Sequence, residues 1–213
     1  DVLASGLLPI CFGEATKISQ YLLREKKSYS SQFVFGKTTR SGDLEGEVLS
    51  KKSTDFLTKE LITRATEKFI GRIAQVPPMH SALKKNGVPL YKLARRGIDV
   101  PREAREVQIF RFNLKDFAGS TAVFDIDCSK GTYVRQLAKD LGEELGCGAC
   151  VSSLRRECLG NYHVSYAYTA SALREVAKSE GYAGLDNVLW KVDSALSSMP
   201  FTRTSSSENT KLK

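Results

Sequence analysis

Apolar and polar residues alternate most clearly in the middle of the chain, where two segments follow a two-residue period. The apolar positions of the two segments are, first, Val107, Ile109, Phe112 and Leu114, with a phase slip at Phe110, and second, Ala122, Phe124, Ile126 and Cys128. This period predicts two strands that each bury one face. A turn at Ala118-Gly119-Ser120 separates them, which favours a hairpin. Residues 29–35 are rich in β-formers and predict a further strand, followed by glycine turns and another strand near Val48.

Other segments carry apolar residues at helical spacing. Thr58 can serve as the N-cap of a helix whose apolar positions are Leu61, Ile62, Ala65 and Phe69 and which ends before Gly71. A loop over residues 129–132 leads to a second helix with an apolar stripe of Val134, Leu137, Ala138, Leu141 and Leu145, which Gly146 ends. Arg135 lies in the first turn of this helix. We also expect helices over residues 14–23 and from Thr169 onward.

These elements predict an α+β fold, with a largely antiparallel mixed sheet flanked by helices. The reason is that the strands and helices lack the regular βαβ spacing of a parallel sheet. A hydrophobic share of 41% and a charged share of 26% are typical of a globular protein. We expect one folded domain over residues 1–200 and a disordered, Ser-rich tail over residues 201–213. The sequence shows neither a long apolar run nor a leader pattern, which indicates a cytoplasmic protein without membrane contact.

Positive charge is concentrated in one part of the chain. The formal net charge is +8, and residues 72–111 hold nine basic and three acidic residues, a net charge of +6. This region opens with Pro77-Pro78 and continues as a short predicted helix over residues 89–96, stopped by Gly97. It therefore predicts a positively charged projection that binds a polyanion, most simply a nucleic acid. The alternative is an ordinary solvated surface.

The five cysteines do not form a disulfide framework, because their number is odd and their spacing scattered. Cys147 and Cys150 form a C-x-x-C pair, and with Cys158 and His163 they could make a zinc site. Structural zinc sites usually present two tight ligand pairs, and this set has only one. The sequence therefore favours buried, unreactive thiols over a metal site.

The first ten residues, D-V-L-A-S-G-L-L-P-I, resemble the D-P-L-A-[TS]-G-[ML]-L-P-I segment of the TruB family of tRNA pseudouridine synthases. Further blocks follow in the order of that family, and the resemblance runs from residue 1 to about residue 165. These blocks are Gly13-Glu14-Ala15-Thr16-Lys17, Lys27-Ser28-Tyr29, Pro77-Pro78-Met79-His80-Ser81-Ala82-Leu83-Lys84, Leu90-Tyr91, Ala94-Arg95-Arg96-Gly97, Cys128-Ser129-Lys130-Gly131-Thr132-Tyr133-Val134-Arg135, Leu145-Gly146-Cys147-Gly148-Ala149 and Leu154-Arg155-Arg156.

The resemblance implies a pseudouridine synthase fold and isomerisation of the uridine at position 55 in the T loop of tRNA. It places the catalytic aspartate at Asp1, as nucleophile or proton acceptor. Arg135 corresponds to the arginine that keeps this carboxylate ionised and aimed. Tyr29 corresponds to the tyrosine that stacks on the flipped uracil and assists proton removal from its C5. Tyr133 and Leu154 correspond to residues that line the base pocket.

The resemblance also assigns the basic projection to RNA binding, with contacts to the T arm. Its candidate RNA-binding residues are Lys84, Lys85, Arg95 and Arg96. The chemistry requires no metal or organic cofactor, and the sequence has no P-loop or dinucleotide glycine pattern. It indicates no obligate protein partner and no C-terminal RNA-binding PUA domain.

The chain departs from the family pattern in three places. Family members carry an upstream segment that ends in a G-H-T-G-x-L block, whereas this sequence starts at Asp1, so we expect a fragment of a longer protein. Val2 replaces a proline, and Arg40 stands where an acidic residue is common. Two alternatives stay open: a non-catalytic RNA-binding or tRNA-folding module of the same fold, and a zinc-stabilised RNA binder.

Overall fold

The computed structural model describes residues 2–197 and 199–200 of the chain. The chain divides into two compact units. The first, called the sheet unit below, comprises Asp1–Pro9 and Arg24–Ala167, and the second, the helical unit, comprises Ile10–Leu23 and Tyr168–Lys213. The prediction of a single domain over residues 1–200 stays a prediction. The predicted tail over residues 201–213 lies outside the described residues.

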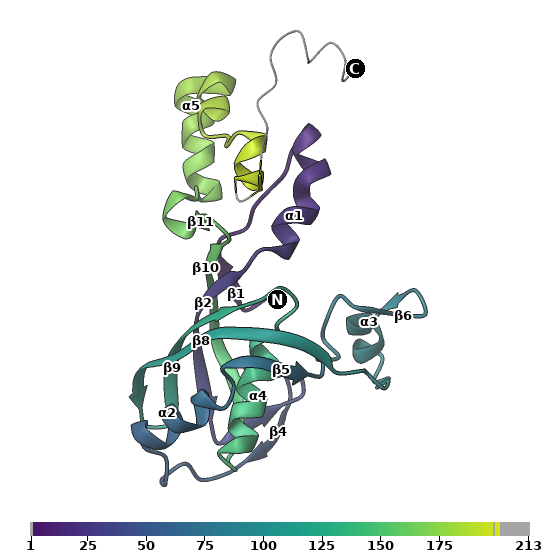
Figure 1. Cartoon of the computed structure of the whole chain (residues 1–213), viewed down its shortest axis with the longest axis vertical. Helices are drawn as coiled ribbons and strands as arrows, with labels where there is room; N and C mark the ends of the chain where they lie inside the picture. The colour runs from purple at the N-terminus through teal and green to yellow at the C-terminus, as the bar shows by residue number, and fades with distance from the viewer. Residues whose placement is uncertain (1, 198, 201–213) are drawn as a thin grey trace. The chain divides into compact units, whose positions relative to one another are not determined.

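The sheet unit is built on a seven-stranded sheet (Figure 1). Its strands are β1 (Ala4–Gly6), β2 (Lys27–Phe35), β5 (Gly71–Gln75), β8 (Arg105–Ala118), β9 (Thr121–Cys128), β10 (Ala149–Leu159) and β11 (Tyr162–His163). Their order is β1-β10-β2-β9-β8-β5, and β11 pairs with β10. Only the β1–β10 pairing within this sheet is parallel. The predicted largely antiparallel mixed sheet is therefore confirmed.

Two helices, α2 (Lys59–Glu67) and α4 (Val134–Glu144), cover one face of the sheet (Figure 1). The α2 helix packs on β8, and α4 packs on β10 and β2. Their apolar stripes meet the inward side chains of the strands, and the fully buried centre of this core includes Phe33, Ile62, Phe124, Ile126, Leu137 and Leu141. Burial of this kind contributes the main stabilising free energy of the unit.

The predicted hairpin is the β8–β9 pair, and the phase slip at Phe110 is a register shift between Ile109 and Arg111. The hydroxyl of Thr58 accepts a hydrogen bond from the Leu61 amide (3.2 Å), which confirms the predicted N-cap of α2. The predicted strand near Val48 is β4 (Val48–Lys51), which pairs with β3 (Lys37–Thr39) in a separate ribbon.

Four strands of the seven-stranded sheet, β1, β5, β10 and β11, were not predicted, and β10 is the most important of them because it pairs with β1, β2 and β11. Register shifts interrupt β10 between Val151 and Ser153 and between Arg156 and Cys158. Each shift breaks the two-residue period, so alternation along the sequence does not reveal the strand. The other three, β1, β5 and β11, are three, five and two residues long and carry too few apolar positions to show a period.

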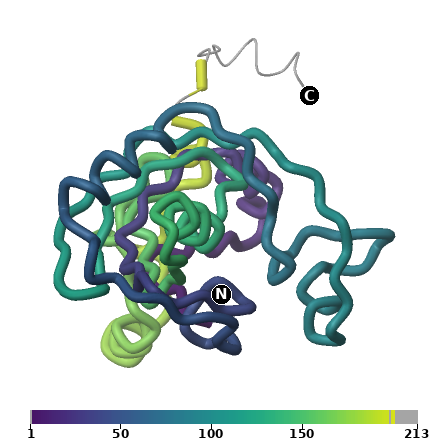
Figure 2. The backbone as a smooth tube through the Cα atoms, turned by 90° about the horizontal axis from the view of Figure 1, so that it is seen from below, coloured from purple at the N-terminus to yellow at the C-terminus, as the bar shows by residue number. Residues whose placement is uncertain are grey.

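The basic projection contains β6 (Lys84–Lys85), β7 (Val88–Pro89) and α3 (Leu90–Arg95). Within the sheet unit, it leaves the sheet after β5 and returns to it at β8, and Figure 2 shows its loops standing to one side of the sheet. The tight β6–β7 turn uses Asn86 and Gly87, both with positive φ (49° and 80°), as a two-residue hairpin of this kind requires. The predicted short helix over residues 89–96 is α3.

The helical unit contains η1 (Gly13–Ile18), most of α1 (Ser19–Arg24), α5 (Ala170–Asn187) and η3 (Val192–Leu196). The helix predicted over residues 14–23 is thus a 3₁₀ segment followed by a short α-helix. Thr169 caps α5 as expected, accepting a hydrogen bond from the Ala172 amide (3.1 Å). A short 3₁₀ turn, η2 (Val164–Tyr166), belongs to the sheet unit. In the described part of the chain, no helix is both long and apolar enough to cross a membrane.

Candidate active site

Three neighbouring strands bring distant parts of the sequence into one row across the sheet. Gly6 of β1 lies opposite Arg156 of β10, and Arg156 lies opposite Tyr29 of β2. Leu154, two residues before Arg156, is buried at 6% exposure and pairs with β1 on one side and β2 on the other. Of the predicted pocket residues, Leu154 therefore lies on the strand beside the one that follows Asp1, and Tyr29 lies one strand further across the sheet. Asp1 itself lies outside the described residues.

The phenol of Tyr29 is half-buried and packs against the core. Burial raises its pKa, and neighbouring Cys128 raises it further, whereas the Arg156 guanidinium beside it lowers it. The net shift is upward, so the phenol stays protonated at neutral pH. Tyr29 thus offers an aromatic face and a neutral hydroxyl.

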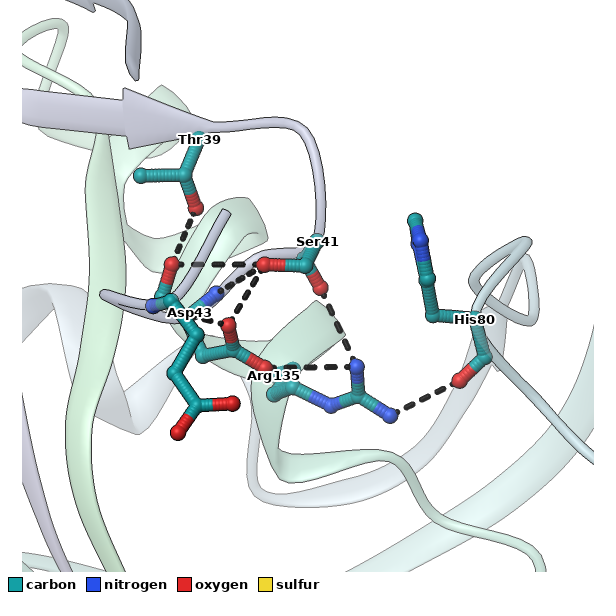
Figure 3. A network of polar contacts seen from close by, with 6 residues as sticks. Thr39, Ser41, Asp43, His80 and Arg135 are labelled. Atoms are coloured by element: carbon teal, nitrogen blue, oxygen red, sulfur yellow. Dashed lines mark hydrogen bonds and ion pairs between the residues drawn. The ribbon is translucent and has the colours of Figure 1, made fainter. Parts of the chain in front are cut away.

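Arg135 projects from the first turn of α4 and is buried, with 7% exposure (Figure 3). Its Nη1 donates to the Ser41 carbonyl (3.2 Å) and lies 3.5 Å from Oδ2 of Asp43. Its Nη2 donates to the His80 carbonyl (2.8 Å). Burial lowers the pKa of Arg135 and Asp43 opposes this shift, but the guanidinium remains charged because its reference value is so high.

Asp43 was not identified from the sequence as a functional residue. It lies in the loop between β3 and β4 and is 6% exposed. Its Oδ1 accepts hydrogen bonds from Ser41 Oγ (2.5 Å) and the Glu45 amide (3.2 Å), and its carbonyl accepts one from Thr39 Oγ1 (2.6 Å) (Figure 3). Both oxygens of the carboxylate are therefore engaged, one by the loop and the other by Arg135.

The loop that carries Asp43 is tied to the sheet. The Leu44 amide donates to the Val151 carbonyl (2.9 Å), and the Val151 amide donates to the Gly42 carbonyl (3.0 Å). Two backbone bonds to β10 thus flank Asp43 and fix the position of the carboxylate relative to the sheet. A buried ion pair is weak evidence for stability, so its rigid placement favours an orienting role for Asp43.

Tyr133 occupies the N-cap position of α4, two residues before Arg135. The side chain of Gln75, the last residue of β5, forms two hydrogen bonds with the backbone of Tyr133. Gln75 Nε2 donates to the Tyr133 carbonyl (3.2 Å), and Gln75 Oε1 accepts from the Tyr133 amide (2.8 Å). Gln75 is 1% exposed and was also not identified from the sequence. It fixes the start of the helix that carries Tyr133 and Arg135.

The four predicted RNA-binding residues all lie on the basic projection. Lys84, Lys85, Arg95 and Arg96 are exposed, and within the described residues none of them forms an ion pair. The Arg95 guanidinium lies 5.5 Å from the centre of the Tyr91 ring, which holds it by a cation–π contact. Their charges are therefore available to phosphate groups.

The four residues of the possible zinc site do not form one. Cys147, Cys150 and Cys158 are free thiols, and the first two are almost completely buried. His163 Nδ1 bonds instead with the hydroxyl of Ser165 (2.7 Å). Among the described residues, no three His, Cys, Asp or Glu side chains are grouped so that they could hold a metal ion. The described residues therefore give the zinc-stabilised alternative no support.

Two family models match the chain. The one described as "TruB family pseudouridylate synthase (N terminal domain)" matches residues 1–134, and the one described as "tRNA pseudouridylate synthase B C-terminal domain" matches residues 135–197. A "tRNA pseudouridine synthase B" of Pseudomonas fluorescens (strain Pf0-1) is 47% identical over 205 residues, which are 96% of this chain and 67% of the relative. The protein of that name from Dechloromonas aromatica is 47% identical over 200 residues, 94% of this chain and 65% of the relative.

Solved structures share the fold. The chain superimposes on one in "Crystal Structure of a Cbf5-Nop10-Gar1 Complex" with a TM-score of 0.66 and 23% identity, covering 90% of this chain and 49% of the other. The "archaeal box H/ACA sRNP Nop10-Cbf5 complex" gives a TM-score of 0.64 at 19% identity, covering 91% of this chain and 49% of the other. The family models together span residues 1–197, and the resemblance inferred from the sequence is confirmed: this chain belongs to the TruB family of pseudouridylate synthases.

Proposed function

We propose that the chain isomerises uridine to pseudouridine at position 55 in the T loop of tRNA. The observation that carries this proposal is the row across the sheet, in which Leu154 lies on the strand next to the one that follows Asp1 and Tyr29 lies one strand further on. Its relatives named tRNA pseudouridine synthase B support the substrate class. The chain spans about two thirds of the length of these relatives, so the activity of the whole protein forms part of the proposal.

The reaction breaks the glycosidic bond from N1, turns the uracil, and joins C5 to the same sugar carbon; C5 loses its hydrogen as a proton, and N1 gains a proton. No atom or electron is gained overall, so the proposed chemistry needs only acids, bases and a nucleophile. Asp1 is the proposed carboxylate that acts as nucleophile or proton acceptor. Tyr29 stacks on the base once it leaves the RNA stack, and Leu154 supplies an apolar wall.

Arg135 is proposed to hold the carboxylate of Asp1 ionised and in one plane. A guanidinium has five N–H donors in a rigid fork, enough for two backbone carbonyls, Asp43 and a further carboxylate. Asp43 and the His80 carbonyl fix the plane of this fork before substrate binds. A preoriented charge costs no reorganisation when the reaction occurs, which is why its fixation matters to the rate.

Binding of tRNA is proposed to come from the basic projection. Lys84, Lys85, Arg95 and Arg96 present unpaired charges to the phosphates of the T arm, and structured RNA is recognised largely by shape and backbone. The proposed place of action is the cytoplasm, where tRNA is found. No obligate protein partner is part of the proposal.

Tritium at C5 of uridine provides the test, because isomerisation releases it to water. Purified protein should release one tritium per tRNA without added cofactor, and a tRNA with cytidine at position 55 should release none. The alternative, a non-catalytic RNA-binding or tRNA-folding module, predicts salt-dependent binding of both tRNAs with no release. Binding without release would therefore overturn the proposed function.

A further inference from the structure

Two neighbouring arginines of β10 have different surroundings. Arg155 is exposed, and its Nε forms an ion pair with Glu157 (3.0 Å). Arg156 is half-buried, and its Nε donates instead to the Leu7 carbonyl (2.7 Å). In a basic RNA-binding protein, both would ordinarily be interpreted as phosphate contacts. The structure distinguishes the two arginines, because the Arg156 side chain donates a hydrogen bond to the backbone of the sheet unit and the Arg155 side chain forms an exposed ion pair.

Both the backbone and the side chain of Arg156 form hydrogen bonds with the segment that follows Asp1. The Arg156 carbonyl accepts a hydrogen bond from the Leu7 amide (2.8 Å), while the Leu7 carbonyl accepts from Arg156 Nε. Gly6 fits between them because it has φ +92°, and a Cβ at this position would lie 2.3 Å from the Arg156 carbonyl oxygen. Gly6 and Leu7 therefore pack closely against Arg156 of β10.

These hydrogen bonds from Arg156 matter because β1 is otherwise weakly held. It is a three-residue edge strand, all of its residues are exposed, and it pairs with β10 alone. Short exposed strands bury little apolar surface and open easily. The hydrogen bond from the Arg156 side chain to the Leu7 carbonyl adds a second attachment, directly after β1.

On its other side Arg156 adjoins Tyr29. The two residues are direct partners in the β2–β10 register, and the guanidinium is close enough to lower the pKa of the phenol against the effect of burial. One side chain therefore contacts both the strand that follows the proposed nucleophile and the tyrosine proposed to stack on the base.

We propose that Arg156 is a positioning residue that sets the distance between the Asp1 segment and Tyr29, and that it is not a phosphate anchor. This inference rests on the proposed function. Its loss should leave tRNA binding intact and lower the rate of the bound complex, because displacements of about 1 Å in an active site can lower rates about 100-fold.

Arg156→Met, Arg156→Lys and the matched control Arg155→Met separate the possibilities. Single-turnover tritium release with the protein in saturating excess over tRNA gives the rate of the bound complex, and binding at several salt concentrations gives the affinity and its salt slope. We expect Arg156→Met to lower the bound-state rate by about 10- to 100-fold with affinity and salt slope unchanged. Arg156→Lys, which keeps the charge beside Tyr29, should recover part of the rate. Arg155→Met should keep the wild-type rate.

The outcomes distinguish this inference from the proposed function. Absence of tritium release by the wild-type protein would overturn the function itself. If the wild type is active and Arg156→Met is as fast as Arg155→Met, only the positioning role is overturned. The same holds if Arg156→Met binds tRNA more weakly and with a flatter salt slope but keeps the wild-type rate of the bound complex. Should Arg156→Met fail to fold in a thermal melt, Arg156→Lys decides: a rate equal to wild type contradicts the proposal, and a reduced rate at unchanged affinity supports it.

Discussion

Arg135 and Asp43 form a buried ion pair, with Nη1 of the arginine 3.5 Å from Oδ2 of the aspartate and both side chains less than a tenth exposed. They are far apart in the sequence and come from α4 and from the loop between β3 and β4. Because Asp43 is itself fixed by Ser41 and by the attachment of its loop to β10, the pair holds the guanidinium in one orientation. The first two predictions follow from this arrangement.

Arg135→Lys should lower the bound-state rate strongly, by about 100-fold or more, while tRNA affinity and its salt slope change little. Lysine keeps the charge but loses the planar fork that meets Asp43 and two carbonyls at once. Single-turnover kinetics beside binding at several salt concentrations measures both quantities. Weaker binding with a flatter salt slope and an untouched bound-state rate would show that Arg135 grips phosphate instead.

Asp43→Asn should lower the bound-state rate by about tenfold and reduce the free energy of unfolding. The amide retains an acceptor for the Ser41 hydroxyl and the Glu45 amide but leaves the buried guanidinium without this carboxylate. Urea denaturation and single-turnover tritium release measure the two effects. Asp116→Asn, at an exposed position of β8, is the control and should match wild type in both. A wild-type rate for Asp43→Asn would remove the orienting role.

Gln75→Leu should slow the reaction without weakening binding, because the side chain of Gln75 holds the backbone of Tyr133 at the start of α4. Loss of both bonds deprives the part-buried Tyr133 amide of its acceptor, a cost of about 1–3 kcal/mol in stability, whereas the Tyr133 carbonyl keeps the bond from the Leu137 amide (3.0 Å). Thr66→Val, which removes a different buried hydrogen bond from α2, is the control for destabilisation alone. Equal bound-state rates for the two variants would contradict a role of Gln75 in the site.

Replacing Lys84 or Arg95 by alanine should weaken tRNA binding and lower the salt slope by about one unit for each phosphate group that the variant no longer neutralises. The rate of the bound complex should change less, because the basic projection binds RNA and takes no part in the chemistry. Lys139→Ala, on the exposed side of α4, provides a control for removal of a positive charge elsewhere. A control variant with the same salt slope as Lys84→Ala would indicate a diffuse electrostatic effect.

The sequence was informative where a period was intact. The β9 strand and α4 each keep one apolar face over many residues, so their pattern alone predicts them. The β8 strand was predicted in spite of its register shift at Phe110, because its apolar positions resume at Phe112 and Leu114. The bulges of β10 interrupt its period, so the strand became visible only through its partners. The roles of Tyr29 and Arg135 came from the family resemblance, since a tyrosine in a strand or an arginine at a helix start has many uses.

Asp43 and Gln75 could not be predicted for a different physical reason. An aspartate in a loop with glycines is usually a solvated turn residue, and only the pairing of this loop with Val151 turns its carboxylate inward. A glutamine at the end of a short strand likewise carries no pattern of its own. Both roles depend on contacts between segments that are distant in the sequence, which neither period nor composition encodes.

In the proposed mechanism, one carboxylate, that of Asp1, performs the chemistry, while many charges of the basic projection bind the RNA. Single-turnover tritium release by Asp1→Asn, with its tRNA affinity measured in parallel, tests this most directly. We expect no detectable release at an affinity close to that of wild type, because binding and chemistry use different residues. Release by Asp1→Asn at the wild-type rate would contradict it.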